Sequence, residues 1–123
     1  MKQIVVFLAD GFEEIEALSP VDYLRRAGAE VITAATGKTA VEVNGAHGIK
    51  VLADTTLDEY LNGMESLPDA VVCPGGMPGA ANIAACSKAV ELIRRMNESG
   101  RLVAAICAAP AIVLPATGSL EGK

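Results

Sequence analysis

Cysteine, histidine and long apolar runs are scarce in this sequence. Its 123 residues include three cysteines, an odd number, and none of them stands in a Cys-x-x-Cys pair. That count argues against a disulfide scaffold and against a zinc site, and it fits a reducing compartment. No apolar run approaches the roughly 20 residues that span a bilayer, and the N-terminus enters a strand without the layout of a signal peptide. We therefore expect a cytoplasmic protein with no membrane partner.

Positive charge is also low. Ten Lys and Arg residues face fifteen Asp and Glu residues, which leaves a formal net charge of -5. Non-specific binding to nucleic acid depends on clustered basic side chains, so this balance argues against a nucleic-acid partner. The content of 51% apolar and 20% charged residues is typical of a globular chain, and the length suits one domain.

The spacing of apolar residues predicts alternating strands and helices. Residues 4–9 form a continuous apolar run, typical of a strand buried on both faces of a parallel sheet. Residues 14–27 carry apolar side chains at helical spacing, from Ile15 through Tyr23, and Gly28 ends the helix. The order predicts an α/β fold with a mostly parallel central sheet and helices on both faces. The other expected elements are strand 30–35, a hairpin of 41–43 and 49–52 about Asn44-Gly45, short helix 57–61, strand 69–73, helix 80–99, strand 102–106 and helix 108–114.

The segment 102–114 is the most informative, because it places Cys107 where a buried strand becomes a helix. Pro110 lies near the helical start, where a missing N–H costs nothing. The small residues Ala105 and Ala109 flank the cysteine in the pattern of a nucleophile elbow, with Ala in place of the usual Gly. Unpaired N–H groups and the helix dipole at that place favour the thiolate. We predict that Cys107 is the only non-glycine residue in a clearly disfavoured backbone conformation.

A plainer interpretation stays open for every cysteine, since most free cysteines are small buried packing residues. Cys73, at the end of a predicted strand, and Cys86, within a predicted helix, fit that description best. Cys73 lies close enough in sequence to Gly75 to line a site there.

Ligands of open α/β sheets bind outside the carboxyl ends of the strands, where Pro74-Gly75-Gly76 and Cys107 both lie. Gly75 and Gly76 lack a Cβ atom, so their N–H groups can approach a ligand closely. With the Ala108 N–H they can form an oxyanion hole. A tight strand-to-helix turn is the alternative, and it explains the two glycines without any ligand.

Glu13, Glu14 and Glu16 fall in the first turn of a predicted helix, where the dipole favours carboxylates, so capping and solvation explain each of them. Glu16 differs because its apolar neighbours put it on or near the buried face. Desolvation favours a protonated carboxyl, which can donate to a thiolate or transfer protons. We expect Glu16 to be mostly buried and within hydrogen-bond reach of the Cys107 sulfur. His47, the single histidine, is expected in a surface loop, so no Cys-His dyad is predicted within this chain.

Three segments together resemble a known family. ADGFEEIEALSPVDYLRRAG, VVCPGGMPGAANI and AAICAAPAIVL, in this order and spacing, are similar to the ThiJ/PfpI superfamily. The likeness is strongest to its parkinsonism-associated deglycase branch, which includes the bacterial YajL-like proteins, and it covers nearly the whole chain. Ala109 departs mildly from the family's usual Ala-Ile-Cys-Ala-Gly-Pro elbow.

The resemblance implies a flavodoxin-like three-layer sandwich and a homodimer, with no cofactor and no metal. It implies that Cys107 is the reactive cysteine, that Glu16 is the protonated carboxyl bonded to it, and that Gly75, Gly76 and Ala108 supply oxyanion donors. The family keeps further sheet, closing helices and a histidine near the cysteine in a C-terminal third that this chain lacks. We therefore expect residues 1–123 to be the N-terminal part of a single domain, whose remainder is missing or is a C-terminal fragment of the same protein on another chain.

The activity that the resemblance implies is a cysteine-dependent glyoxalase or deglycase. Its substrates are 2-oxoaldehydes such as methylglyoxal, or their early glycation adducts. Two alternatives stay open. One is a non-enzymatic redox sensor or stress chaperone whose Cys107 is oxidised to a sulfinate held by Glu16. The other is the peptidase activity of hexameric relatives, for which this chain offers no second base.

Overall fold

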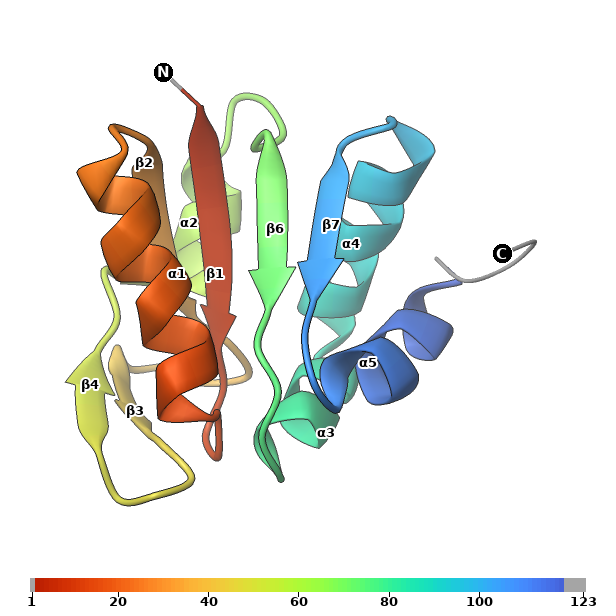
Figure 1. Cartoon of the computed structure of the whole chain (residues 1–123). Coiled ribbons are helices and arrows are strands. Elements are labelled where there is room, and N and C mark those ends of the chain that lie inside the picture. Colours follow the sequence, from red (N-terminus) through yellow and green to blue (C-terminus); the bar gives the residue numbers. More distant parts are fainter. Residues whose placement is uncertain (1, 119–123) are drawn as a thin grey trace.

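The computed structural model describes residues 2–118 as a three-layer α/β sandwich (Figure 1). The central sheet has five parallel strands in the order β5-β2-β1-β6-β7. The predicted α/β fold with a parallel central sheet is therefore confirmed. The strands are β1 (Gln3–Leu8), β2 (Glu30–Ala35), β5 (Thr55–Thr56), β6 (Ala70–Cys73) and β7 (Leu102–Ala105).

Helices cover both faces of this sheet, and a small antiparallel hairpin stands beside it. In the view of Figure 1, α1 (Glu14–Arg26) lies in front of β1 and β2, whereas α2 (Leu57–Gly63) and α4 (Ser87–Glu98) lie behind the sheet. Two more helices, α3 (Gly79–Ala84) and α5 (Ala109–Thr117), follow the carboxyl ends of β6 and β7. The hairpin pairs β3 (Glu42–Asn44) with β4 (Lys50–Leu52), as the Asn44-Gly45 pattern predicts.

Strand β1 shows how the sequence builds the two cores. Side chains alternate across a strand, so Val5 and Phe7 enter the core behind the sheet while Val6 and Leu8 enter the core under α1. All four are fully buried. A strand apolar at every position is the pattern that two covered faces require.

The predicted single helix over 80–99 is wrong, because the structure has two helices there. Cys86 adopts an extended conformation, with φ -89° and ψ 106°, and its N–H donates to the Ile83 carbonyl oxygen at 3.0 Å. That bond closes the last turn of α3, and α4 begins afresh at Ser87. Apolar spacing alone does not report such a break. The two-residue strand β5 is also absent from the sequence prediction.

The predicted apolar stripe of α1 is only partly right. Val21 is buried as expected, but Ile15 is 73% exposed and Tyr23 is 71% exposed. These two side chains form part of the outer surface of the helix, so their spacing is not a core signal.

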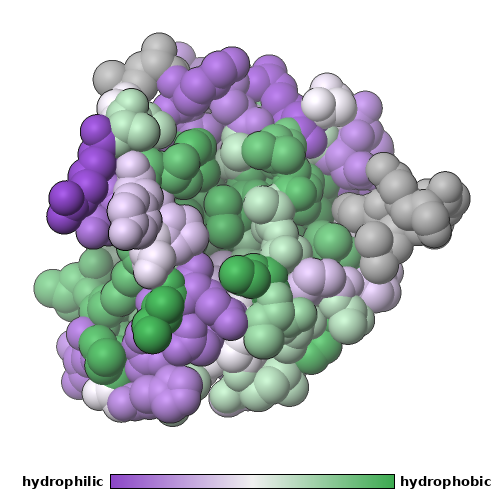
Figure 2. Space-filling view, viewed as in Figure 1, coloured by the Kyte–Doolittle hydropathy of each residue, from purple (hydrophilic) through white to green (hydrophobic). Residues whose placement is uncertain are grey.

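The front of the sheet is covered unevenly. In Figure 1 no helix of the described residues crosses the front of β6 and β7, and Figure 2 shows apolar surface in that region. Leu102 is 64% exposed there, and Val72 and Ala104 are partly exposed. Within residues 2–118, no helix combines the length and apolar character needed to cross a membrane.

Candidate active site

Cys107 has the strained backbone that the sequence predicts. Its φ is 59°, and among the described residues it is the one non-glycine residue with positive φ. A side chain in that region costs about 1–3 kcal/mol, and such strain persists where the surrounding structure imposes it. The thiol is exposed, at the turn between the end of β7 and the start of α5.

Hydrogen bonds on both sides of Cys107 impose this turn. The Ile106 N–H donates to the Cys73 carbonyl oxygen at 3.2 Å, which continues the pairing of β7 with β6. The Ala109 N–H donates to the Ile106 carbonyl oxygen at 3.1 Å, which already bends the chain into the helix. Strand pairing thus ends and helical bonding begins within three residues, and Cys107 takes up the change of direction.

The other two cysteines are built differently. Cys73 is fully buried at the end of β6, and burial raises the pKa of its thiol to about 12. Cys86 is half-buried at the start of α4. As the sequence predicts, Cys73 packs in the core, so Cys107 is the exposed thiol among the three.

Glu16, Gly75 and Cys107 meet at one point, as the sequence predicts. The Gly75 N–H donates to Glu16 Oε1 at 3.1 Å. A Cβ atom on Gly75 would lie 2.6 Å from Glu16 Oε1 and 2.8 Å from Cys107 Cβ. Gly75 is 59 positions from Glu16 and 32 positions from Cys107, yet the three residues pack with no room for a methyl group between them.

Glu16 departs from the expectation in two respects. It is half-buried rather than mostly buried, and no hydrogen bond of the described residues joins it to Cys107. A backbone N–H is a stronger donor than a thiol, so Oε1 takes the Gly75 N–H instead. The Gly75 N–H is consequently occupied. In the described part of the chain no hydrogen bond occupies the N–H groups of Gly76 and Ala108, the other two oxyanion donors that the sequence analysis expects.

Three glycines bring the loop after β1 against the loop after β6. A Cβ atom on Gly76 would lie 2.5 Å from the Glu13 nitrogen, and one on Gly79 would lie 2.7 Å from the Gly11 oxygen. A Cβ atom on Gly11 would lie 2.5 Å from Pro78 Cδ. We call Gly11, Gly76 and Gly79 the glycine seam. It fixes the start of α1, which carries Glu16, relative to the Gly75 turn.

Glu13 caps α1, as expected, but Glu14 does not. Glu13 Oε2 accepts the Glu16 N–H at 2.9 Å. Glu14 is 5% exposed, and its carboxylate contacts the hairpin loop, residues 45–49, where it accepts the N–H groups of His47 at 2.8 Å and Ile49 at 3.3 Å. His47 Nδ1 lies 2.8 Å from Glu14 Oε1. Sequence reasoning missed this contact, since nothing local pairs residues 33 positions apart.

Glu14 and His47 each stabilise the charged form of the other. Burial acts to raise the pKa of Glu14, but hydrogen bonds from the His47 ring and from backbone N–H groups outweigh it and lower the pKa to about 2. The hydrogen bond and charge of Glu14 raise the pKa of His47. His47 is at the surface, as predicted, and the contact gives it a defined partner.

Glu13, Glu14 and His47 are also the group of described residues whose side-chain ligand atoms could share a cation, all within 4.8 Å of one another. Both Glu14 oxygens already accept N–H or ring-nitrogen contacts from the hairpin loop. His47 Nδ1 and Glu14 Oε1 are in direct contact at 2.8 Å, which is the geometry of an ion pair.

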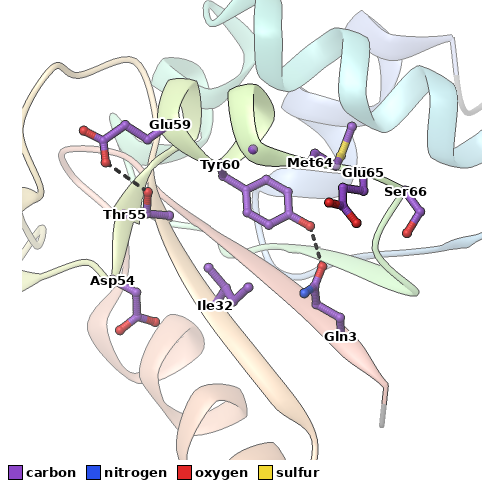
Figure 3. A pocket seen from close by; sticks show the side chains of 10 residues that line it. Gln3, Ile32, Asp54, Thr55, Glu59, Tyr60, Met64, Glu65 and Ser66 are labelled. Atoms are coloured by element: carbon purple, nitrogen blue, oxygen red, sulfur yellow. Dashed lines mark hydrogen bonds between the residues drawn. The ribbon is translucent and has the colours of Figure 1, made fainter.

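A separate hollow of about 590 Å³ lies beside α2 (Figure 3). Tyr60 points into it and donates to Gln3 Oε1 at 2.6 Å, and burial, with the nearby Glu30 charge, raises the pKa of Tyr60. None of Glu16, Gly75 or Cys107 lines this hollow, so it does not belong to the thiol site.

The crowding at Gly75 leads to a prediction. Gly75→Ala is expected to lower kcat/KM for methylglyoxal, the substrate that the resemblance implies, by about a hundredfold. The added methyl group must push the side chain of Glu16 or Cys107 out of its place. Gly63→Ala is the matched control, since a Cβ atom there meets nothing within 4 Å. Steady-state kinetics on both variants make the comparison. Equal kcat/KM values for the two variants would show that the close packing at position 75 does not contribute to catalysis.

An exposed thiol on a strained strand-to-helix turn, at the carboxyl end of a parallel sheet, defines a nucleophile-elbow α/β protein. The comparisons with known proteins make this specific: the chain belongs to the DJ-1/PfpI family, whose model matches residues 2–123.

Individual relatives agree with this assignment. The chain is 41% identical to protein DJ-1 homolog A of Arabidopsis thaliana, over 99% of this chain and 30% of that protein. It is 37% identical to the deglycase PfpI of Pyrococcus furiosus, over 98% of this chain and 69% of that protein. The structure of oxidized Toxoplasma gondii DJ-1 superimposes with a TM-score of 0.92 at 38% identity, over 99% of this chain and 64% of that one. The chain thus spans less than two thirds of the Arabidopsis and Toxoplasma proteins.

Proposed function

We propose that this chain supplies the reactive part of a cysteine-dependent glyoxalase or deglycase acting on 2-oxoaldehydes, such as methylglyoxal, or on their early glycation adducts. The observation that carries the proposal is the exposed Cys107 thiol at φ 59°, with Glu16 held beside it on Gly75. Relatives named deglycases support it, at 37% identity in Pyrococcus furiosus and 35% in Thermococcus kodakarensis.

The proposed chemistry starts at the aldehyde carbon of methylglyoxal. The Cys107 thiolate forms a carbon–sulfur bond there, and the carbonyl oxygen takes a proton to give a hemithioacetal. Glu16 removes the proton from that carbon and returns one to the neighbouring carbon, which yields a lactoyl thioester. Water then breaks the carbon–sulfur bond and releases lactate and the thiol. The sum is methylglyoxal plus water to lactate, so no external oxidant or reductant is needed.

The geometry suits these steps. Glu16 accepts the Gly75 N–H through Oε1, and Oε2 makes no hydrogen bond in the described part of the chain, so we assign the proton transfers to Oε2. We assign the stabilisation of the oxygen that gains charge to the Gly76 and Ala108 N–H groups, because no hydrogen bond of the described residues occupies them.

We also propose a cytoplasmic homodimer. Ile15, next to Glu14 in the sequence, and Ile49, whose N–H donates to the Glu14 carboxylate, are apolar side chains that are 73% and 52% exposed. Burying them against a second copy is favourable. Sedimentation velocity tests the assembly, and Ile15→Lys is expected to shift it toward monomer.

The test of the activity is the product. Purified protein incubated with methylglyoxal in D₂O is expected to release lactate that carries deuterium on the carbon next to the carboxylate, because the proton returned there exchanges with solvent. Mass spectrometry during turnover should detect the lactoyl adduct on the peptide that holds Cys107. A sample that forms neither lactate nor adduct would falsify the enzymatic proposal.

A redox function is the second candidate, and one observation favours it. The structure of the Toxoplasma gondii relative, 38% identical, is of an oxidized protein. Two equivalents of peroxide would oxidise the exposed Cys107 thiol first to a sulfenic acid and then to a sulfinate, with release of water, and Glu16 would donate a hydrogen bond to that sulfinate. A peroxide-dependent change in partner binding without turnover of methylglyoxal would favour this sensor or chaperone role.

A further inference from the structure

Glu14 lies between two residues of the candidate site in the sequence, Glu13 and Glu16, yet its carboxylate contacts another part of the fold. The buried side chain ends on the hairpin loop, where one carboxylate gathers two backbone N–H groups and one imidazole nitrogen. Acidic side chains at helix starts ordinarily face solvent, so burial of this one at 5% exposure needs a reason.

We propose that Glu14 is a positioning residue, which fastens the hairpin loop to the start of α1 and thereby holds Glu16 in its place beside Cys107. The inference rests on the proposed function. It assigns a role to a residue that touches neither the thiol nor the oxyanion donors.

The start of α1 is hydrogen-bonded on two opposite sides. The hairpin holds the preceding segment with two backbone bonds, from the Gly11 N–H to the Asn44 oxygen and from the Ala46 N–H to the Phe12 oxygen, both 2.8 Å. On its opposite side the Glu13 N–H donates to the Gly75 oxygen at 3.0 Å. The start of α1 is thus held between the hairpin and the Gly75 turn, and Glu14 is its side-chain anchor to the hairpin.

Gly45 shows how tightly this anchor fits. A Cβ atom at position 45 would overlap the Glu14 carboxylate and would lie 2.5 Å from Glu14 Cδ. Only the bare backbone of glycine allows the loop to close over the buried oxygens. The loop and the carboxylate are therefore fitted to each other, and a change in either displaces the other.

The charge of Glu14 is part of the anchor. Its pKa is lowered, from 4.5 to about 2, so the anchor is complete above pH 4.5 and weakens as the pH falls from 4.5 toward 2. The groups that face it are His47, whose raised pKa favours its charged form, and Glu13, whose Oε1 lies 3.8 Å from His47 Nδ1. Losing the His47 charge as pH rises through its pKa weakens the pair but leaves the backbone donors.

The test compares Glu14→Gln with Glu42→Gln. Both remove one carboxylate charge on or against the same hairpin, but Glu42 is exposed and makes only a 3.5 Å ion pair with Lys50. The readout is the pH profile of Cys107 alkylation by iodoacetamide, followed on its peptide by mass spectrometry, together with kcat and KM. Alkylation needs no turnover, so failure of the proposed function and failure of this inference give different results.

Glu14→Gln is expected to move the alkylation midpoint to higher pH by about half a unit, because a displaced Glu16 can no longer offer to the thiolate the proton that the proposed function assigns to Oε2. It is also expected to lower kcat by about tenfold with KM within about twofold. Glu42→Gln should match the unmodified protein. A folded Glu14→Gln protein with an unchanged alkylation profile and unchanged kcat overturns the proposal. If that variant does not fold, Gly45→Ala decides: its Cβ atom would overlap the Glu14 carboxylate and force it off the hairpin loop, so an unshifted midpoint there also overturns the proposal.

Discussion

Cys107→Ser is expected to abolish the turnover of methylglyoxal, with kcat/KM lower by at least about a thousandfold. The physical reason is the nucleophile. A serine hydroxyl at the same strained turn keeps the shape of the site, but at neutral pH almost none of it is ionised to the alkoxide that would attack the aldehyde. The measurement is lactate formation over time at fixed substrate, with the unmodified protein run in parallel.

Cys86→Ser is the matched control for that experiment. Cys86 is a second free thiol, half-buried at the start of α4, and no hydrogen bond of the described residues joins it to Glu16 or Gly75. Its replacement should leave turnover unchanged. If the Cys107 variant keeps its activity, or if both variants lose it equally, the assignment of Cys107 as nucleophile is wrong.

Residues 1–123 expressed alone are expected not to unfold in a cooperative, monomeric transition. Leu102 is 64% exposed and Ile106 is 46% exposed, next to the uncovered front of β6 and β7. Each aliphatic side chain left in water forfeits roughly 1.5–3 kcal/mol, and a few such losses exhaust the ~5–15 kcal/mol that stabilises a typical domain. We propose that a further segment, from the same protein or a second polypeptide, covers this face.

Thermal unfolding followed by far-ultraviolet circular dichroism, with sedimentation to establish the mass, measures this. Leu102→Lys provides the comparison. In the isolated chain it should raise the solubility. When a further segment covers the front of β6 and β7, the same substitution should lower the free energy of unfolding. A sharp two-state transition of a monomeric 123-residue chain would contradict the prediction.

The fold was predictable because the burial of a strand or helix fixes the spacing of apolar residues along the sequence. The apolar run of β1 and the helical spacing of α1 depend only on residues within a few positions. The elbow was predictable for the same reason, since the residues around Cys107 carry the strand, the small neighbours and the proline within one short segment. The break at Cys86 was not, because it depends on one backbone conformation that many residues adopt.

For the candidate site, the sequence predicted which residues come together but not which atoms bond. Parallel strands end at one edge of a sheet, so Glu16, Gly75 and Cys107 could be expected to converge. Which atoms bond is a different matter. That Gly75 rather than Cys107 donates to Glu16, and that Glu14 is buried against His47, depends on distances of a few ångströms between residues far apart in sequence.

The glycine seam has a consequence for how this sequence can diverge. At Gly11, Gly76 and Gly79 a methyl group has no space, because backbone atoms of the opposite loop occupy it. A substitution at one of these glycines is therefore tolerated only if the backbone of the opposite loop shifts as well. Such a shift needs a second substitution, and two matching substitutions rarely arise together. Gly28, by contrast, has nothing within 4 Å, so only its positive φ of 93° restrains it, and asparagine meets that requirement at small cost. Among descendants of this sequence, the seam should stay fixed as a block while position 28 varies on its own.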